Sequence, residues 1–251
     1  MLTTVLAIMK IVIGGSSGFV GTEIVRQALT NPAVTTVIAL SRRETMIPTS
    51  CASKYAMKLK SVVCDDFENY PDSIKDELHD VDACIWQHRT IAVTPMKLKT
   101  LPWEEIVKVS RDYAVTAIET LANLPRKQGG QPLRFIYMSG HFAPRERGQQ
   151  LKVLDNNGMV EYGFLRGEAE NRILEYAEQS KGVVQACIAK SGFVNAPGLT
   201  APNVPGLPTI ELETIAAALL AQAMNGFEKD TLFSDDMTRI GGKALAEWRT
   251  V

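Results

Sequence analysis

Residues 10–21, with the sequence KIVIGGSSGFVG, constrain the fold of this chain more than any other stretch. A short apolar run ends at Gly14, small residues follow, and an amphipathic segment begins directly after Gly21. This is the order of a strand, a glycine turn and a helix, in which the backbone approaches a phosphate and the helix N-terminus offers unpaired N–H groups. A tight turn in some other α/β protein is the alternative. The pattern predicts a dinucleotide pyrophosphate site formed by Gly14, Ser16, Ser17, Gly18, Phe19 and Val20.

Apolar strand-like runs alternate with helical stretches along the rest of the chain. We expect strands at residues 34–40, 58–64, 83–86, 133–138 and 183–190, and helices at 72–78, 103–124, 160–179, 211–225 and 241–249. Near-continuous apolar strands separated by helices are typical of a buried parallel sheet covered on both faces. The expected fold is α/β, a doubly wound parallel sheet (Rossmann fold) with strand order 3-2-1-4-5-6, and its ligands lie beyond the carboxyl ends of the strands.

Length and composition limit the number of domains and the classes of partner that we expect. The 251 residues suffice for one domain spanning 1–251, with a small C-terminal substrate-binding segment at 195–251. With 27 basic and 28 acidic residues and no basic stripe, nucleic acid is not an expected partner. Residues 1–8 are too short and wrongly flanked for a signal peptide or a membrane span, so we expect a cytoplasmic protein without a membrane partner. The four cysteines lack metal-ligand spacing, and we expect buried free thiols and no metal.

The end of the second strand indicates which dinucleotide binds. Ser41, followed by Arg42 and Arg43, stands where NAD-binding proteins carry an Asp or Glu for the ribose 2′-hydroxyl. Two guanidinium groups and no acid favour the 2′-phosphate of NADP(H), although a solvated basic turn has the same sequence. Past the third strand, Asp65 and Asp66 lie at the expected adenine edge, where Asp65 accepts from the adenine amino group or caps a helix.

Polar residues past the fifth strand are candidates for chemistry. Ser139 lies at the strand tip, and Tyr162 and Arg166 are spaced to share one face of the next helix. The serine and the tyrosine form a polar pair suited to hold a carbonyl oxygen. A nearby cation lowers the pKa of a tyrosine and makes it a better acid. His141 is the second candidate proton donor.

These motifs resemble those of a short-chain dehydrogenase/reductase of the atypical or extended kind, related to the nucleotide-sugar epimerase and NmrA-like groups. The resemblance runs from Met9 onward and rests on IVIGGSSGFVG, SRR, CDDF, FIYMSG and YGFLRGEAEN. In that family a serine orients the carbonyl, a tyrosine donates the proton, and a lysine holds the nicotinamide ribose. The resemblance implies these roles for Ser139, Tyr162 and, in the lysine's place, Arg166, which will not readily release a proton. A surface position for Arg166, paired with its acidic neighbours, is the alternative.

A second departure from the family pattern follows the fourth strand. Where relatives often carry small residues against the nicotinamide ribose, this chain has Trp86, Gln87, His88 and Arg89. We expect Trp86 and Gln87 to contact the cofactor, and His88 is an alternative acid or forms a local hydrogen bond. The resemblance also places Lys190, at the end of the sixth strand, near the nicotinamide or its ribose.

Three functions remain open from the sequence. The first is an NADP(H)-dependent oxidoreductase that reduces a small carbonyl or imine. The second is an isomerase or cyclase of secondary metabolism on the same fold, and the third is a non-enzymatic NADP(H) sensor. The short C-terminal segment favours a small-molecule substrate, and family habit suggests a monomer or homodimer.

Overall fold

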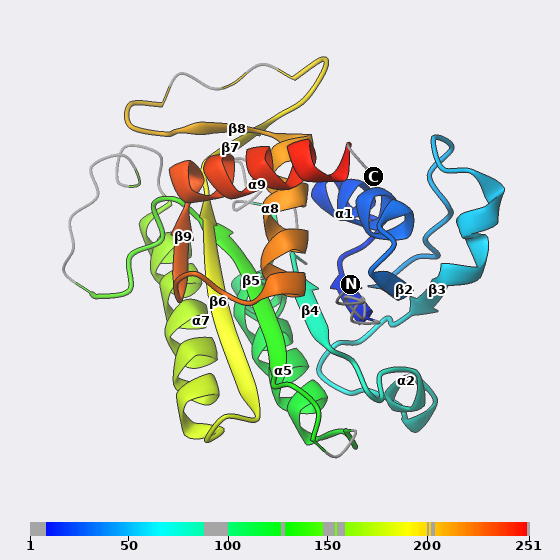
Figure 1. Cartoon of the computed structure of the whole chain (residues 1–251). Coiled ribbons are helices and arrows are strands. Elements are labelled where there is room, and N and C mark those ends of the chain that lie inside the picture. The colour runs from blue at the N-terminus through cyan, green and yellow to red at the C-terminus, as the bar shows by residue number, and fades with distance from the viewer. Residues whose placement is uncertain are drawn as a thin grey trace.

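A parallel sheet of seven strands forms the centre of the molecule in the computed structural model (Figure 1). The structure describes residues 9–87, 100–126, 129–147, 154, 159–199, 201 and 204–249. The strand order is β3-β2-β1-β4-β5-β6-β9, and every neighbouring pair is parallel. The strands are β1 (Met9–Gly14), β2 (Val34–Ser41), β3 (Leu59–Val63), β4 (Ala83–Trp86), β5 (Leu133–Gly140), β6 (Val184–Ser191) and β9 (Thr231–Phe233). The expected α/β fold and the order of the first six strands are confirmed.

Helices cover both faces of this sheet, as the apolar strands require. In Figure 1, α1 (Phe19–Thr30), α8 (Leu212–Asn225) and α9 (Ser234–Trp248) lie on the near face, and α5 (Tyr113–Asn123) and α7 (Val160–Gln179) lie behind it. Alternate residues of β5 enter opposite cores: Ile136 packs with the near layer, and Phe135 packs with the far one. The smaller helices are α2 (Asp72–Glu77), the 3₁₀ helix η1 (Ser53–Lys58) and α4 (Trp103–Val107).

The single helix expected at 103–124 is interrupted by a π-helical turn, η2 (Lys108–Asp112), between α4 and α5. A π turn widens the hydrogen-bonding ladder locally and is frequent at functional sites. Here the carbonyl of Ser110 accepts from the Tyr137 hydroxyl at 2.8 Å and from the Arg166 guanidinium at 3.4 Å. The turn therefore gives two side chains from β5 and α7 a backbone acceptor.

The C-terminal segment contains more regular structure than expected. Strand β9, which the sequence analysis missed, has only three residues and pairs with β6. The last helix, α9, begins at Ser234 rather than at 241, and the carboxylate of Asp236 accepts the backbone N–H of Phe233 at its start. Two further short strands, β7 (Phe193–Asn195) and β8 (Thr209–Glu211), form a small sheet of their own.

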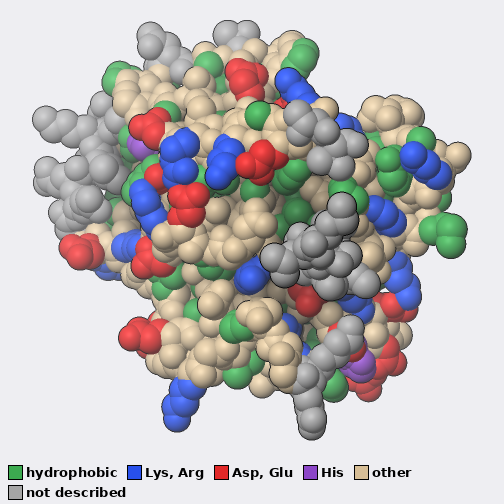
Figure 2. Space-filling model, in the orientation of Figure 1, with side chains coloured by type: hydrophobic (Ala, Val, Ile, Leu, Met, Phe, Trp, Pro, Cys, Tyr) green, Lys and Arg blue, Asp and Glu red, His purple; other side chains and the backbone are tan. Residues whose placement is uncertain are grey.

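Three of the four cysteines are the buried free thiols that the sequence predicts. All four cysteines are free, and Cys64, Cys84 and Cys187 are buried, whereas Cys51 is partly exposed. Burial raises the pKa of the Cys64 thiol to about 11. Figure 2 shows Lys/Arg and Asp/Glu side chains interspersed over α9. Two residues of α9 form ion pairs with the segment before β9, Asp236 with Lys229 and Arg239 with Glu228. Among the helices described, none is long and apolar enough to cross a membrane.

Candidate functional site

The glycine turn joins β1 to α1 and is held by backbone contacts. Gly15 has a φ of 79°, a left-handed conformation that favours glycine, and its N–H donates to Leu40 O at 2.8 Å. Gly18 is the N-cap of α1, and no side chain caps that helix. The first N–H groups of α1 therefore have no side-chain cap from the described residues, and a helix end of this kind can bind an anion.

The last residue of β4 and the residue after it pack against this turn. A Cβ at Gly14 would meet the Trp86 ring, and a Cβ at Gly21 would meet the Gln87 amide and the Gly15 carbonyl. Trp86 is fully buried and packs edge to face on Phe67, and the Gln87 amide donates to the Gly15 carbonyl. Trp86 and Gln87, which we expected to contact the cofactor, thus pack against the glycine turn.

The next two residues, His88 and Arg89, lie outside the described residues, as do residues 1–8. Their expected roles stay predictions.

The arginine pair expected to bind the 2′-phosphate lies just past the end of β2, the strand beside β1. Arg42 and Arg43 are both exposed, and neither has an ion-pair partner among the residues that the structure describes. Ser41 is buried, and its hydroxyl donates to the Arg43 carbonyl at 2.5 Å. The two guanidinium groups are therefore free to meet an anion beside the glycine turn.

The acidic pair after β3 is exposed. The Asp66 carboxylate accepts the Glu68 backbone N–H at 2.9 Å and so closes a local turn. The helix-capping alternative for Asp65 is wrong, because α2 begins at Asp72 and its N-cap is Pro71.

Ser139 is fully buried at the tip of β5, and its hydroxyl donates to Glu170 Oε1 at 2.5 Å. Glu170 is also fully buried, on α7. Sequence reasoning missed this carboxylate, although Glu170 lies four residues after Arg166 and so shares its helix face. The structure therefore gives Ser139 an acidic partner rather than Tyr162.

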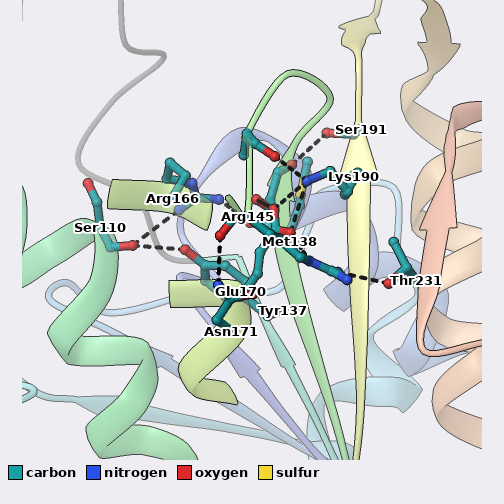
Figure 3. Close-up of polar contacts among 12 residues, drawn as sticks. Ser110, Tyr137, Met138, Arg145, Arg166, Glu170, Asn171, Lys190, Ser191 and Thr231 are labelled. Carbon is teal, nitrogen blue, oxygen red and sulfur yellow. Dashed lines mark hydrogen bonds and ion pairs between the residues drawn. The ribbon is translucent and has the colours of Figure 1, made fainter. Parts of the chain in front are cut away.

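Glu170 stands at the centre of a buried ionic network (Figure 3). Lys190 Nζ lies 2.8 and 2.9 Å from its two carboxylate oxygens, and Arg145 Nε donates to Oε2 at 2.7 Å. Lys190 also donates to the Ala143 carbonyl at 2.5 Å, and Arg145 extends to the hydroxyl of Thr231 at 2.8 Å. Burial lowers the pKa of Lys190, and the attraction of Glu170 opposes that shift. The network ties β5, β6, α7 and β9 together.

Arg166 is buried behind that network, so the surface alternative for it is wrong. Its guanidinium donates to the Met138 carbonyl at 2.5 Å and lies 4.7 Å from the centroid of the Tyr137 ring. Backbone oxygens and an aromatic face thus hold a fixed positive charge beneath the strand tips.

Tyr162 lies one helical turn before Arg166 and is 8% exposed. It packs with Ile106 and Leu165 in a small apolar cluster at the start of α7. Arg166 is close enough to interact electrostatically with Tyr162. The expected pairing of tyrosine and cation on one helix face is present.

His141 follows β5 and is partly buried between the rings of Phe142 and Phe233. Its Nδ1 is buried without a hydrogen-bond partner among the described atoms. Burial, and then the charge of Lys190, lower its pKa below the usual 6.5, so the fold favours the neutral ring. A neutral ring is a better proton acceptor than donor.

Strand β5 ends at Gly140, next to these groups. A Cβ at Gly140 would meet none of the described atoms within 4 Å. Across the described ranges, no group of three or more His, Cys, Asp or Glu residues could hold a metal ion.

A separate cavity of about 520 Å³ lies at the opposite, amino-terminal end of the strands. Arg134, Gln222 and Trp248 are among its lining residues, and Arg134 donates to the last carbonyls of α8. It is therefore remote from the glycine turn and from Glu170.

Comparisons with known proteins identify the fold. No family model matches the sequence, and no curated protein matches it. A short-chain dehydrogenase/reductase from Saccharomyces cerevisiae matches with a TM-score of 0.65 at 15% identity, over 91% of this chain and 96% of that chain. Vestitone reductase from alfalfa (Medicago sativa L.) matches with a TM-score of 0.60 at 17% identity, over 89% and 76%. MoeE5 in complex with UDP-glucuronic acid and NAD matches with a TM-score of 0.63 at 15% identity, over 90% and 76%. The chain has the Rossmann fold that these proteins share.

Proposed function

We propose that this chain is an NADP(H)-dependent oxidoreductase that reduces a small carbonyl or imine. The observation that carries the proposal is the uncapped N-terminus of α1 beside two exposed arginines at the tip of β2. The helix end suits the pyrophosphate, and the Arg42–Arg43 pair suits the 2′-phosphate. The likeness to solved reductase structures supports the same class.

The proposed chemistry divides between the cofactor and this chain. The nicotinamide, when bound, supplies the hydride. Tyr162 donates the proton, and Arg166 carries its buried charge one helical turn further along α7. Because arginine keeps its proton, Arg166 acts electrostatically and does not pass a proton on. The Ser139 hydroxyl donates a hydrogen bond to Glu170, so its part is to position that carboxylate.

Replacement of Tyr162 by Phe tests the role of the hydroxyl. NADPH oxidation is followed by absorbance with a panel of small aldehydes, ketones and cyclic imines. We expect at least a hundredfold loss of turnover, the usual contribution of a general acid being about 10²–10⁴-fold. Tyr176→Phe, on the same helix and partly buried away from the strand tips, is the matched control and keeps its activity. Full turnover in Tyr162→Phe would contradict the assignment.

A non-enzymatic NADP(H) sensor is the second candidate. It is favoured by the engagement of Ser139 with Glu170 and of Arg166 with backbone carbonyls, which leaves neither group free. A sensor binds NADP⁺ and NADPH with different affinities and oxidises no NADPH with any member of the panel. Measured binding without turnover would replace the first proposal by this one.

A further inference from the structure

Four hydroxyl side chains gather behind the glycine turn, and the function proposed so far does not use the arrangement. Ser16 is 0% exposed, Ser41 1% and Thr45 7%, and Ser61 is partly buried beside them. Ser16 belongs to the turn after β1, Ser41 ends β2, Thr45 lies in the segment past β2, and Ser61 lies on β3. These neighbouring strands stand at one side of the sheet in Figure 1.

Thr45 is the centre of this hydroxyl cluster. Its Oγ1 is hydrogen-bonded to Ser16 Oγ at 2.7 Å and lies 3.4 Å from Ser41 Oγ. Its backbone N–H donates to Ser61 Oγ at 2.9 Å. One residue thus connects the glycine turn, the end of β2 and the middle of β3.

The cluster also fixes the backbone that carries the two arginines. Arg42 and Arg43 lie beyond the end of β2, between Ser41 and Thr45, with exposed side chains. The Ser41 hydroxyl holds the Arg43 carbonyl at 2.5 Å, and Thr45 anchors the far end of the segment. The arginine backbone is therefore held at a set position relative to the turn, while the guanidinium groups extend into solvent.

We propose that Thr45 is a specificity-determining positioning residue for the 2′-phosphate of the cofactor. Its hydroxyl sets the distance between the glycine turn, which takes the pyrophosphate, and the arginine pair, which takes the 2′-phosphate. This inference rests on the NADP(H) binding proposed above. Groups held in place before binding lose less conformational freedom when a ligand arrives, so they bind it more tightly. A dinucleotide without the 2′-phosphate does not use the arginines and is insensitive to their placement.

Thr45→Val tests the inference because it keeps the shape of the side chain and removes the hydroxyl. Calorimetry gives the dissociation constants of NADP⁺ and NAD⁺, and of the half-ligands adenosine 2′,5′-bisphosphate and adenosine 5′-monophosphate. We expect NADP⁺ and the bisphosphate to bind about fivefold more weakly, the scale of one lost hydrogen bond, while NAD⁺ changes by less than about twofold. Thr45→Ser, which restores a hydroxyl, recovers the wild-type ratio. Thr49→Val, an exposed threonine on the same segment, is the control and leaves the ratio unchanged.

The outcomes separate this inference from the function on which it rests. A Thr45→Val protein with the wild-type ratio of NADP⁺ to NAD⁺ affinity overturns it. Equal weakening of both dinucleotides also overturns it, because the cluster then supports only the turn. A wild-type protein that does not prefer NADP⁺ overturns the proposed cofactor choice and this inference with it. If Thr45→Val does not fold, Thr45→Ala is judged by the same ratios.

Discussion

Glu170→Gln removes the charge at the centre of the buried network and leaves its shape nearly unchanged. The wild-type carboxylate is fully buried and accepts from Ser139, Lys190 and Arg145 at 2.5–2.9 Å. The Lys190 side chain is only 7% exposed, so the amide variant leaves a buried ammonium without its acidic partner. We therefore expect a large loss of stability.

The size of the loss follows from the exposure of the two cations. Breaking a buried ion pair by removing one partner costs about 3–5 kcal/mol. Arg145 is 30% exposed, so water screens its charge and it adds little. The Gln oxygen still accepts one hydrogen bond, which places the loss near the lower limit, about 3 kcal/mol. For a chain of this length that lowers the melting temperature by about 6–12 °C.

Urea unfolding, followed by circular dichroism, measures the loss from the shift in midpoint at constant slope. The matched control is Glu168→Gln, two residues away on the same helix. Glu168 pairs with Arg111 and Arg172 but is 39% exposed, so its replacement costs less than about 1 kcal/mol. A second test combines Glu170→Gln with Lys190→Met, which removes the stranded charge and restores stability relative to Glu170→Gln alone.

The pH dependence of the loss provides a further check. Burial already holds the pKa of Lys190 below 10.5, and removal of Glu170 lowers it further. Above that pKa the folded chain carries a neutral amine while the unfolded chain still binds the proton, so folded stability rises with pH. The difference in unfolding free energy between the wild type and Glu170→Gln therefore becomes smaller from neutral to alkaline pH. The reasoning is refuted if Glu170→Gln costs no more than Glu168→Gln, or if Lys190→Met restores nothing.

Two other predictions concern the near layer and the strand tips. His141 has a pKa below 6.5 in the folded chain, so the unfolded chain takes up the proton first and stability falls as the pH drops below about 6.5. Urea unfolding at several pH values measures the free energy of unfolding of the wild type and of His141→Gln. We expect that of His141→Gln to fall less steeply on acidification, and an equal pH dependence in the two proteins would contradict the burial argument. A Cβ at Gly241 would meet the Thr214 carbonyl of α8, whereas one at Gly242 meets nothing within 4 Å. In thermal melts, Gly241→Ala destabilises by about 1–3 kcal/mol, whereas Gly242→Ala stabilises by about 0.5–1 kcal/mol, and equal effects would count against the packing of α9 on α8.

Local pattern was enough to predict most of the fold. The predicted bounds of β4 and α7 agree with the structure to the residue. A buried apolar strand and a long helix each show their hydrophobic pattern within their own residues, so neighbours in the chain suffice to predict them. The glycine turn was readable for the same reason, since strand, turn and helix are consecutive in the chain. Strand β9 escaped prediction because three residues contain no period, and it exists through its pairing with β6.

The candidate site also contains features set by neighbouring residues and features set by distant contacts. The sequence alone predicted the glycine turn, the Arg42–Arg43 pair and the Tyr162–Arg166 spacing, because each is set by neighbours in the chain. The partner of Ser139, the central position of Glu170 and the linking role of Thr45 were decided only by the tertiary structure. The contacts Ser139–Glu170, Glu170–Lys190 and Ser16–Thr45 join residues 31, 20 and 29 positions apart. A contact of that kind depends on how strands and helices stack rather than on any local preference.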